Sequence, residues 1–232
     1  VTPEAGLKYL IHPIAQADPQ LLDLVDEWVT PGAIVWDIGA NVGLFSIAAA
    51  AKATTSGQVL SVEPDAWLVT LLERSGFAQP TTSAPVDVIC AAVAERIGLR
   101  TFLIAERARA TNALEGYGST QTGGVRQKKT VLTVTMDWLS EHYPPPQLIK
   151  IDVEGAELEV LRGGLKLLRS ARPVIIAEIS NRETVLEIGH LLQELGYQLF
   201  DADYPQSKRQ PLPTAAYNTL AIPDTRLRST TV

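Results

Sequence analysis

Short apolar runs alternate along most of this chain with longer stretches whose apolar residues recur at helical spacing. The short runs predict buried strands, and the longer stretches predict amphipathic helices. Such alternation predicts an α/β fold with a mainly parallel sheet and right-handed crossovers. The predicted strands cover residues 33–38, 58–62, 86–90, 148–151, 173–179, 197–200 and 216–222, and the predicted helices cover 21–29, 43–52, 65–76, 183–195 and a short piece from 135.

Two further runs, 99–104 and 130–134, predict a β-hairpin added to this sheet. The polar, glycine-bearing segment 105–129 joins them, and so long a loop in a compact domain is usually functional or without fixed structure. We interpret it as a lid or substrate-selecting loop with Asn112 and Tyr117 as candidate contacts. A loop without a role is the alternative.

We expect the chain to form a single domain over residues 1–232, with irregular segments at both ends. Residues 1–20 contain three prolines and are expected to form an arm or flap, and residues 223–232 a polar tail. His12 is either a surface histidine or a base carried over the site by that arm. The chain opens on Val1, which is compatible with trimming, processing or excision from a longer polypeptide.

The segment from Asp37 to Gly43 carries the most informative chemistry in the first half of the chain. It follows a buried strand and has the pattern D-x-G-x-N-x-G, which differs from the dinucleotide fingerprint G-x-G-x-x-G. Gly39 and Gly43 permit a sharp turn and close approach of a ligand to the backbone. The Asp37 carboxylate would repel a phosphate but would suit an ammonium or hydroxyl group. A nucleoside that carries a cationic amino acid, such as S-adenosylmethionine, fits this pattern.

An acidic residue at the end of the next predicted strand supports the same ligand. Glu63 lies twenty residues after Gly43 in the sequence, and an acid at about this distance commonly binds ribose hydroxyls in open α/β sheets. Pro64 ends the strand, and Asp65 is suited to cap the following helix.

A second cluster of charged residues follows the predicted strand 148–151. Lys150, Asp152, Glu154 and Glu157 fall within eight residues of sequence, where ligands of open α/β sheets bind. Like charges repel and are costly to bury, so stability alone explains the cluster poorly. A solvated helix start would account for the two glutamates through the helix dipole but less well for Asp152.

Composition and charge argue against several classes of binding partner and structure. The net charge of −6 argues against nucleic acid as an obligatory partner. The sequence lacks any apolar run of about 18 residues, so no membrane-spanning helix is predicted. The single cysteine, Cys90, excludes an internal disulfide and is predicted to be a buried strand thiol, in keeping with a cytoplasmic protein. The basic cluster 126–129 is predicted to lie on a solvated strand end.

Taken together, these segments resemble the FkbM family of S-adenosylmethionine-dependent methyltransferases. The resemblance covers about residues 20–200, and it is specific because the first and fourth of the motifs given below occur together. Met136 stands where the family usually has leucine, and segment 105–129 has no clear counterpart. The matching motifs are residues 37–43 (DIGANVG), Glu63-Pro64, Ala92-Val93 with Gly98, residues 135–139 (TMDWL), residues 150–157 (KIDVEGAE) with 161–163 (LRG), and Glu178 at the end of the next strand.

The resemblance implies a Rossmann-like sheet of seven strands in the order 3-2-1-4-5-7-6, with strand 7 antiparallel and helices on both faces. It also implies methyl transfer to a hydroxyl group of a small molecule or carbohydrate. The residues expected to contact S-adenosylmethionine are Asp37, Gly39, Asn41 and Gly43 for the methionine part, Glu63 for the ribose, Ala91 and Ala92 for the adenine, and also Pro64 and Asp152.

An acceptor hydroxyl must lose its proton, which calls for a positioned base. Asp152 is the first candidate, followed by Glu154 and Glu178, and Lys150 is expected to pair with these acids or to steady the oxyanion. A rival route uses Mg²⁺, for which Asp152, Glu178 and Asn181 are suitable oxygen ligands.

Two other classes of function remain as alternatives. A nicotinamide-dependent oxidoreductase would bind NADH through the same type of turn. A cofactor-binding module without catalysis would bind S-adenosylhomocysteine but methylate no acceptor.

Overall fold

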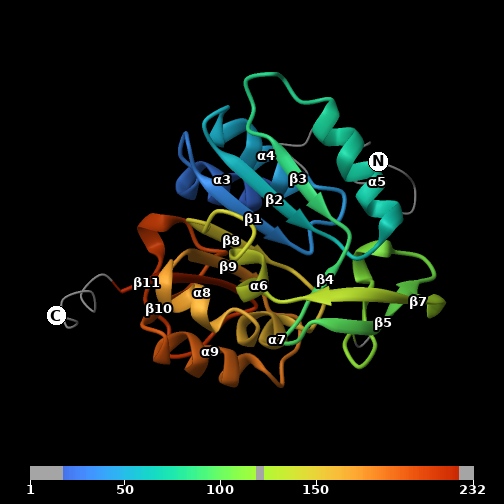
Figure 1. Ribbon diagram of the computed structural model, residues 1–232. Coiled ribbons are helices and arrows are strands. Elements are labelled where there is room, and N and C mark those ends of the chain that lie inside the picture. The colour runs from blue at the N-terminus through green and yellow to red at the C-terminus, as the bar shows by residue number, and fades with distance from the viewer. Residues whose placement is uncertain (1–17, 119–122, 225–232) are drawn as a thin grey trace.

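The computed structural model describes residues 18–118 and 123–224, which form a seven-stranded and a four-stranded sheet (Figure 1). His12 lies outside the described residues, as do most of the expected arm and most of the expected tail. Within the described ranges, no helix is both long and apolar enough to cross a membrane.

The large sheet has the order β10-β11-β9-β8-β1-β2-β3. Counted among the strands of this sheet alone, that is the predicted order 3-2-1-4-5-7-6, and β11 is antiparallel to both of its neighbours. The remaining pairs are parallel. The strands are β1 (Ile34–Ile38), β2 (Gln58–Val62), β3 (Val86–Ile89), β8 (Leu148–Ile151), β9 (Val174–Glu178), β10 (Tyr197–Asp201) and β11 (Asn218–Pro223).

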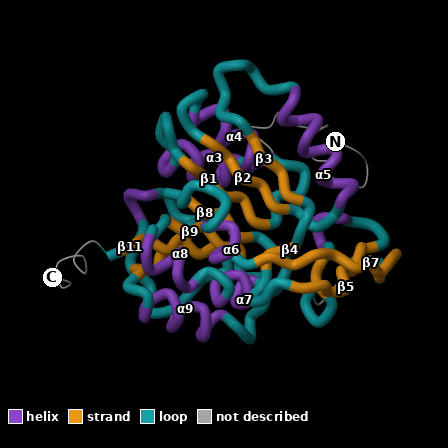
Figure 2. Tube along the Cα trace, in the orientation of Figure 1, coloured by secondary structure: helices purple, strands orange, loops and turns teal. Residues whose placement is uncertain are grey.

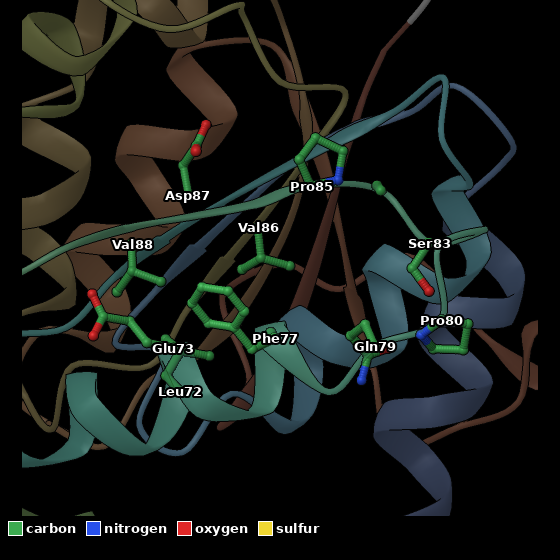
Figure 3. Close-up of a pocket in the computed structure, with 12 residues that line it drawn as sticks. Leu72, Glu73, Phe77, Gln79, Pro80, Ser83, Pro85, Val86, Asp87 and Val88 are labelled. Atoms are coloured by element: carbon green, nitrogen blue, oxygen red, sulfur yellow. The ribbon is translucent and has the colours of Figure 1, made fainter.

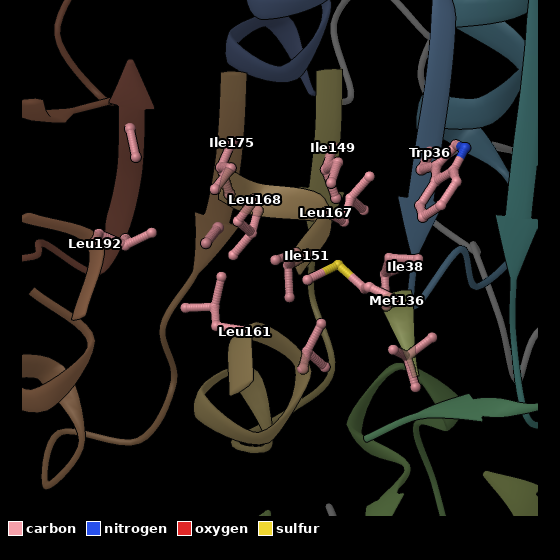
Figure 4. Packing of buried hydrophobic residues seen from close by; sticks show 14 of the residues in the cluster. Trp36, Ile38, Met136, Ile149, Ile151, Leu161, Leu167, Leu168, Ile175 and Leu192 are labelled. Carbon is pink, nitrogen blue, oxygen red and sulfur yellow. The ribbon is translucent and has the colours of Figure 1, made fainter. Parts of the chain in front are cut away.

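Helices cover both faces of the large sheet because successive strand residues point to opposite sides. Figure 2 shows helices on both sides of the large sheet. Val35 of β1 packs with α3 and α4, whereas Trp36 and Ile38 pack with α6 to α9 on the other face (Figure 4). Met136 fills the space between β1 and the helices of this second face (Figure 4). The helices are α3 (Pro19–Trp28), α4 (Leu44–Ala53), α5 (Ala66–Phe77), α6 (Met136–Ser140), α7 (Glu157–Arg162), α8 (Leu165–Ser170) and α9 (Val185–Glu194).

The small sheet extends the predicted hairpin. Its two long strands, β5 (Gly98–Ala105) and β7 (Val125–Val134), are antiparallel, and β4 (Ala92–Val93) and β6 (Ala113–Leu114) flank them. One face of this sheet packs against Ala156, just after β8. We call the segment from β5 to β7, residues 98–134, the insertion. It therefore lies beside the carboxyl end of the large sheet, where the predicted site residues gather.

Two predictions about surface and burial have different outcomes. The basic cluster 126–129 lies on β7 and is largely exposed, as predicted, and Lys128 is paired with Glu115 at 2.5 Å. The prediction that Cys90 is buried is wrong, because β3 ends at Ile89 and the thiol-bearing residue after it is exposed.

The glycine of the LRG motif is required by a close backbone contact. A Cβ atom on Gly163 would lie 2.2 Å from the carbonyl oxygen of Ala94, so the turn between α7 and α8 packs directly on the chain after β4. Gly76 in α5 offers a comparison, because the nearest atom to its Cβ position is 4.0 Å away.

We predict that Gly163→Ala lowers the free energy of unfolding by roughly 1–3 kcal/mol, the usual effect of overpacking. The matched variant Gly76→Ala should be neutral or stabilising, because alanine favours a helix more than glycine does. Urea denaturation followed by circular dichroism measures both. Equal stabilities for the two variants would contradict the packing argument.

Candidate active site at the carboxyl ends of β1, β2 and β8

The turn after β1 requires glycine at two positions. Gly39 has φ +81° and Gly43 has φ +84°, in the left-handed region that favours glycine. A Cβ on Gly39 would lie 1.8 Å from the carbonyl oxygen of Asp152, and one on Gly43 would lie 2.0 Å from Leu72 Cδ1. The turn thus brings the motif at residues 37–43 and the motif at residues 150–157 into direct backbone contact.

Asp37 is fully buried behind this turn, in register with Ser61 on β2 and Lys150 on β8. Its Oδ2 accepts a 2.5 Å hydrogen bond from Ser46 Oγ, which in turn accepts one from Ser61 Oγ. Lys150 Nζ lies 3.6 Å from Oδ1, an atom with no hydrogen bond among the described residues. Burial raises the Asp37 pKa, while Lys150 and Ser46 act in the opposite direction.

Glu63 fastens the turn to the end of β2. Its Oε2 accepts a hydrogen bond from the Asn41 N–H at 2.9 Å, and its Oε1 accepts one from the Asp65 N–H at 2.8 Å. Burial raises the Glu63 pKa to about 7. A carboxylate has about four acceptor positions, so Glu63 keeps capacity for hydroxyl donors.

A cavity lies beside this turn, with walls from both sheets. Most of its lining is apolar, and Asn112 and Asp152 are its polar side chains. Ala92 lines it, whereas Ala91 is fully buried next to it. The lining on the large-sheet side includes Gly39, Val62, Pro64 and Val153, and the insertion adds Phe102, Asn112 and Leu114. Apolar walls with few polar groups are typical of small-molecule sites.

A charged cluster continues from this cavity across β8 and β9. Lys150 Nζ lies 3.1 Å from Asp152 Oδ2, and although burial alone lowers the Lys150 pKa, Asp152 and Asp37 raise it above its usual range. Burial, with Asp152 and Glu178 nearby, raises the Glu154 pKa to about 8. Glu154 also has φ +55°, an uncommon conformation for a residue other than glycine. Strained, pKa-shifted residues of this kind concentrate at functional sites.

Two of the acids have defined hydrogen-bond partners. Glu178 Oε1 accepts a 2.5 Å hydrogen bond from Tyr217 Oη, which sequence reasoning did not single out. Glu157 is fully buried, and its Oε1 accepts hydrogen bonds from the Gly155 N–H and from Ser180 Oγ. Glu157 therefore holds the loop after β8 in place.

The geometry gives the proposed magnesium site no support. Asn181 Oδ1 accepts a hydrogen bond from the Glu183 N–H at 3.0 Å, which ties it to its own loop. Across the described part of the chain, no three histidine, cysteine, aspartate or glutamate side chains form a group suited to a metal ion.

The insertion places its two candidate contacts at different points. Asn112 lines the cavity, and both atoms of its amide group have partners, with Ala105 N–H donating to Oδ1 and Nδ2 donating to Asp65. Tyr117 donates a 2.5 Å hydrogen bond to Glu159, and its Cβ lies 3.4 Å from the Cβ position of Gly155. Tyr117 therefore lies over the loop that carries Asp152 and Glu154.

A second cavity lies away from this cluster, between the last turn of α5 and the beginning of β3 (Figure 3). Phe77, Val86 and Val88 line it, and Phe77 is 95% exposed. It shares none of the predicted site residues.

The strand order, the glycine turn and the acid at the end of β2 define a Rossmann-like protein of the methyltransferase class. Residues 37–199 match the model of the methyltransferase FkbM domain, and the chain belongs to that family.

One curated relative is similar in sequence, and two solved structures are similar in fold. Hexuronic acid methyltransferase AglP of Haloferax volcanii is 30% identical over 145 residues, which cover 62% of this chain and 54% of the relative. An FkbM methyltransferase structure from Methylobacillus flagellatus KT has a TM-score of 0.50 at 14% identity, covering 90% of this chain and 55% of that one. The chain thus spans about half the length of both. Precorrin-6y C5,15-methyltransferase from Geobacter metallireducens GS-15 has a TM-score of 0.51 at 14% identity, covering 90% of this chain and 88% of that one.

The buried hydrogen-bond chain behind the turn provides a stability test. Ser46→Ala removes the donor to Asp37, and we predict a loss of roughly 1–3 kcal/mol in the free energy of unfolding, because a buried acceptor loses its partner. Ser75→Ala is the matched control, since its hydroxyl only donates to the Leu71 carbonyl within α5. Chemical denaturation at pH 7 measures both, and a Ser46→Ala protein as stable as the control would argue against the network.

Proposed function

We propose that this chain is an S-adenosylmethionine-dependent O-methyltransferase that acts on a hydroxyl group of a carbohydrate or another small molecule. The observation that carries the proposal is the cavity between the glycine turn, the end of β2 and Asp152. It joins a nucleoside-type site to a cluster of carboxylates at one edge of the sheet. Membership of the FkbM family supports methyl transfer over the nicotinamide alternative.

The residues present suit S-adenosylmethionine. The absence of Cβ at Gly39 and Gly43 leaves the turn narrow and its backbone accessible, which suits the methionine part. Glu63 has free acceptor capacity for ribose hydroxyls, and Pro64 and Ala92 offer flat apolar contacts for adenine. Asp37 supplies negative charge behind the turn, where its Oδ1 lies 3.6 Å from Lys150 Nζ.

The bound donor supplies an electrophilic sulfonium methyl group. The protein's task is to hold an acceptor oxygen in line with that methyl group, because orientation contributes roughly 7–11 kcal/mol in well-arranged reactions. We assign removal of the hydroxyl proton to Asp152, which lines the cavity. Lys150 holds the Asp152 carboxylate at 3.1 Å, and Glu154 and Glu178 stand beside it as second acceptors for the proton.

The charges around Asp152 favour a neutral acceptor. Burial and the nearby Asp152 raise the pKa of Glu154 and of Glu178, and three carboxyl groups together disfavour an anionic acceptor. Carboxylates readily accept hydrogen bonds from sugar hydroxyls. The relative from Haloferax volcanii is named for a hexuronic acid, which is a carbohydrate with an additional carboxylate. The carboxylate cluster and the relative's substrate name therefore both support a carbohydrate acceptor. The negative charges of this chain additionally favour a sugar without a carboxylate.

An acceptor screen with a labelled methyl donor tests this function. Neutral hexosides and the matching hexuronates should be assayed side by side, together with small alcohols. We expect label on a hydroxyl oxygen and faster transfer to the neutral sugar. Binding of S-adenosylhomocysteine without transfer to any acceptor would favour the non-catalytic module instead.

We predict that Asp152→Asn lowers kcat by roughly 100-fold to 10,000-fold, the usual contribution of a general base. The affinity for S-adenosylhomocysteine should change less than kcat. Asp87→Asn, on β3 and outside the site, is the control. If kcat stays close to that of the unmodified protein, Asp152 is not the base, and the pH–rate profile of Glu154→Gln should then be measured.

We also predict that cofactor affinity depends on pH through Glu63. Its pKa of about 7 in the free protein means that Glu63 is mostly protonated at pH 6. Ribose hydroxyls donate to the ionised form, so binding releases a proton, and affinity for S-adenosylhomocysteine should rise about tenfold between pH 6 and pH 8. Calorimetric titration of Glu63→Gln should give a flat profile, whereas Glu73→Gln on α5 should keep the slope. A flat profile for the unmodified protein would contradict the assignment.

A further inference from the structure

A contact between the insertion and the large sheet joins three polar side chains next to the cavity. Asp65, at the end of β2, is fully buried, and its Oδ1 caps α5 by accepting the Trp67 N–H. Its Oδ2 receives an ion pair from Arg109 Nη1 and a 3.0 Å hydrogen bond from Asn112 Nδ2. Arg109 and Asn112 both belong to the insertion, at the 3₁₀ helix η1 (Arg109–Thr111) and the residue after it.

Arg109 is held on two sides. Its guanidinium carbon lies 4.5 Å from the centre of the Trp67 ring, and the same group is paired with Asp65. Its side chain is only 13% exposed. A cation–π contact and a charge-assisted hydrogen bond are both stronger when water is excluded, so this attachment is firmer than a surface ion pair.

Asn112 connects this attachment to the small sheet. Its Oδ1 accepts the Ala105 N–H at 2.8 Å, which orients Nδ2 toward Asp65. We call Asp65, Trp67, Arg109 and Asn112 the clasp. It fixes the segment that leads into β6, whose Leu114 lines the cavity together with Asn112.

The insertion side of the cavity is closed. Phe102, Asn112 and Leu114 are each buried, and so are Ala92 and Val93 across from them. A purine that enters between these walls has to displace the insertion from the large sheet. The clasp is the polar attachment next to the adenine side of the cavity, while Tyr117 and Arg100 attach the insertion to Glu159 of α7.

We propose that the clasp opens to admit the nucleoside end of the methyl donor and closes again over it, and that Arg109 is the positioning residue that sets how fast the donor exchanges. This inference rests on the proposed function, because it assumes that the cavity takes adenine. A ligand that needs the open form binds more slowly when the closed form is favoured, and it leaves more slowly once the clasp has closed. Weakening the clasp should therefore accelerate both steps.

Stopped-flow binding of S-adenosylhomocysteine tests the proposal with Arg109→Ala. We expect the association and dissociation rates both to rise roughly tenfold, because the ion pair and the ring contact are lost together, while the dissociation constant changes much less. Arg107→Ala removes the same charge from an exposed position in the same loop and should leave both rates unchanged. Arg109→Lys keeps the charge but loses the planar contact, and its rates should lie between the two.

Adenosine serves as the second ligand. Because the clasp adjoins the predicted adenine walls, Arg109→Ala should accelerate adenosine exchange by the same factor as exchange of S-adenosylhomocysteine. Rates that match the unmodified protein, with only a lower melting temperature, would assign the clasp a purely structural role and overturn the proposal. If the unmodified protein bound neither ligand, the proposed function itself would fail, which is a separate outcome. If Arg109→Ala does not fold, Arg109→Lys decides between the first two outcomes.

Discussion

The whole site depends on one backbone contact, the approach of the Asp152 carbonyl to Gly39. No side chain fits between them, since a Cβ on Gly39 would lie 1.8 Å from that oxygen. The contact draws together the ends of β1 and β8, which carry the motifs at residues 37–43 and 150–157. It also explains why a residue with φ +81° stands at this point, because glycine satisfies both the close approach and the left-handed conformation.

Behind this contact lies a layer of charged groups, in which Asp37 is fully buried and the Lys150 side chain is 13% exposed. Asp37 and Lys150 are neighbours across β1 and β8, and Ser46 and Asp152 complete their interactions. Removing one member of such a set leaves an uncompensated buried group, which is more costly than the set as a whole. The same layer holds the Asp152 carboxylate beside Lys150 at the cavity, so stability and the proposed chemistry use the same residues.

The sequence predicts well what local chemistry determines. The glycine turn, the Glu63-Pro64 strand end and the Asp65 cap follow from neighbouring residues, and the strand order follows from the family resemblance. Contacts between distant residues are not visible in the same way: Tyr217 meets Glu178 across 39 positions, and Arg109 meets Asp65 across 44. Strands β4 and β6 have two residues each, too few for a periodic pattern. Cys90 was misjudged because β3 is an edge strand whose residues are only partly buried, and Cys90 follows its end.

The central claim is that the turn from Gly39 to Gly43, with Glu63, binds a sulfonium nucleoside rather than a dinucleotide. Isothermal titration of the dialysed protein at pH 8, with S-adenosylhomocysteine and with NADH, tests it most directly. We expect saturable binding of S-adenosylhomocysteine at one site per chain, loss of that binding in a folded Gly39→Ala variant, and no heat of binding with NADH. Saturable binding of NADH without binding of S-adenosylhomocysteine would contradict it.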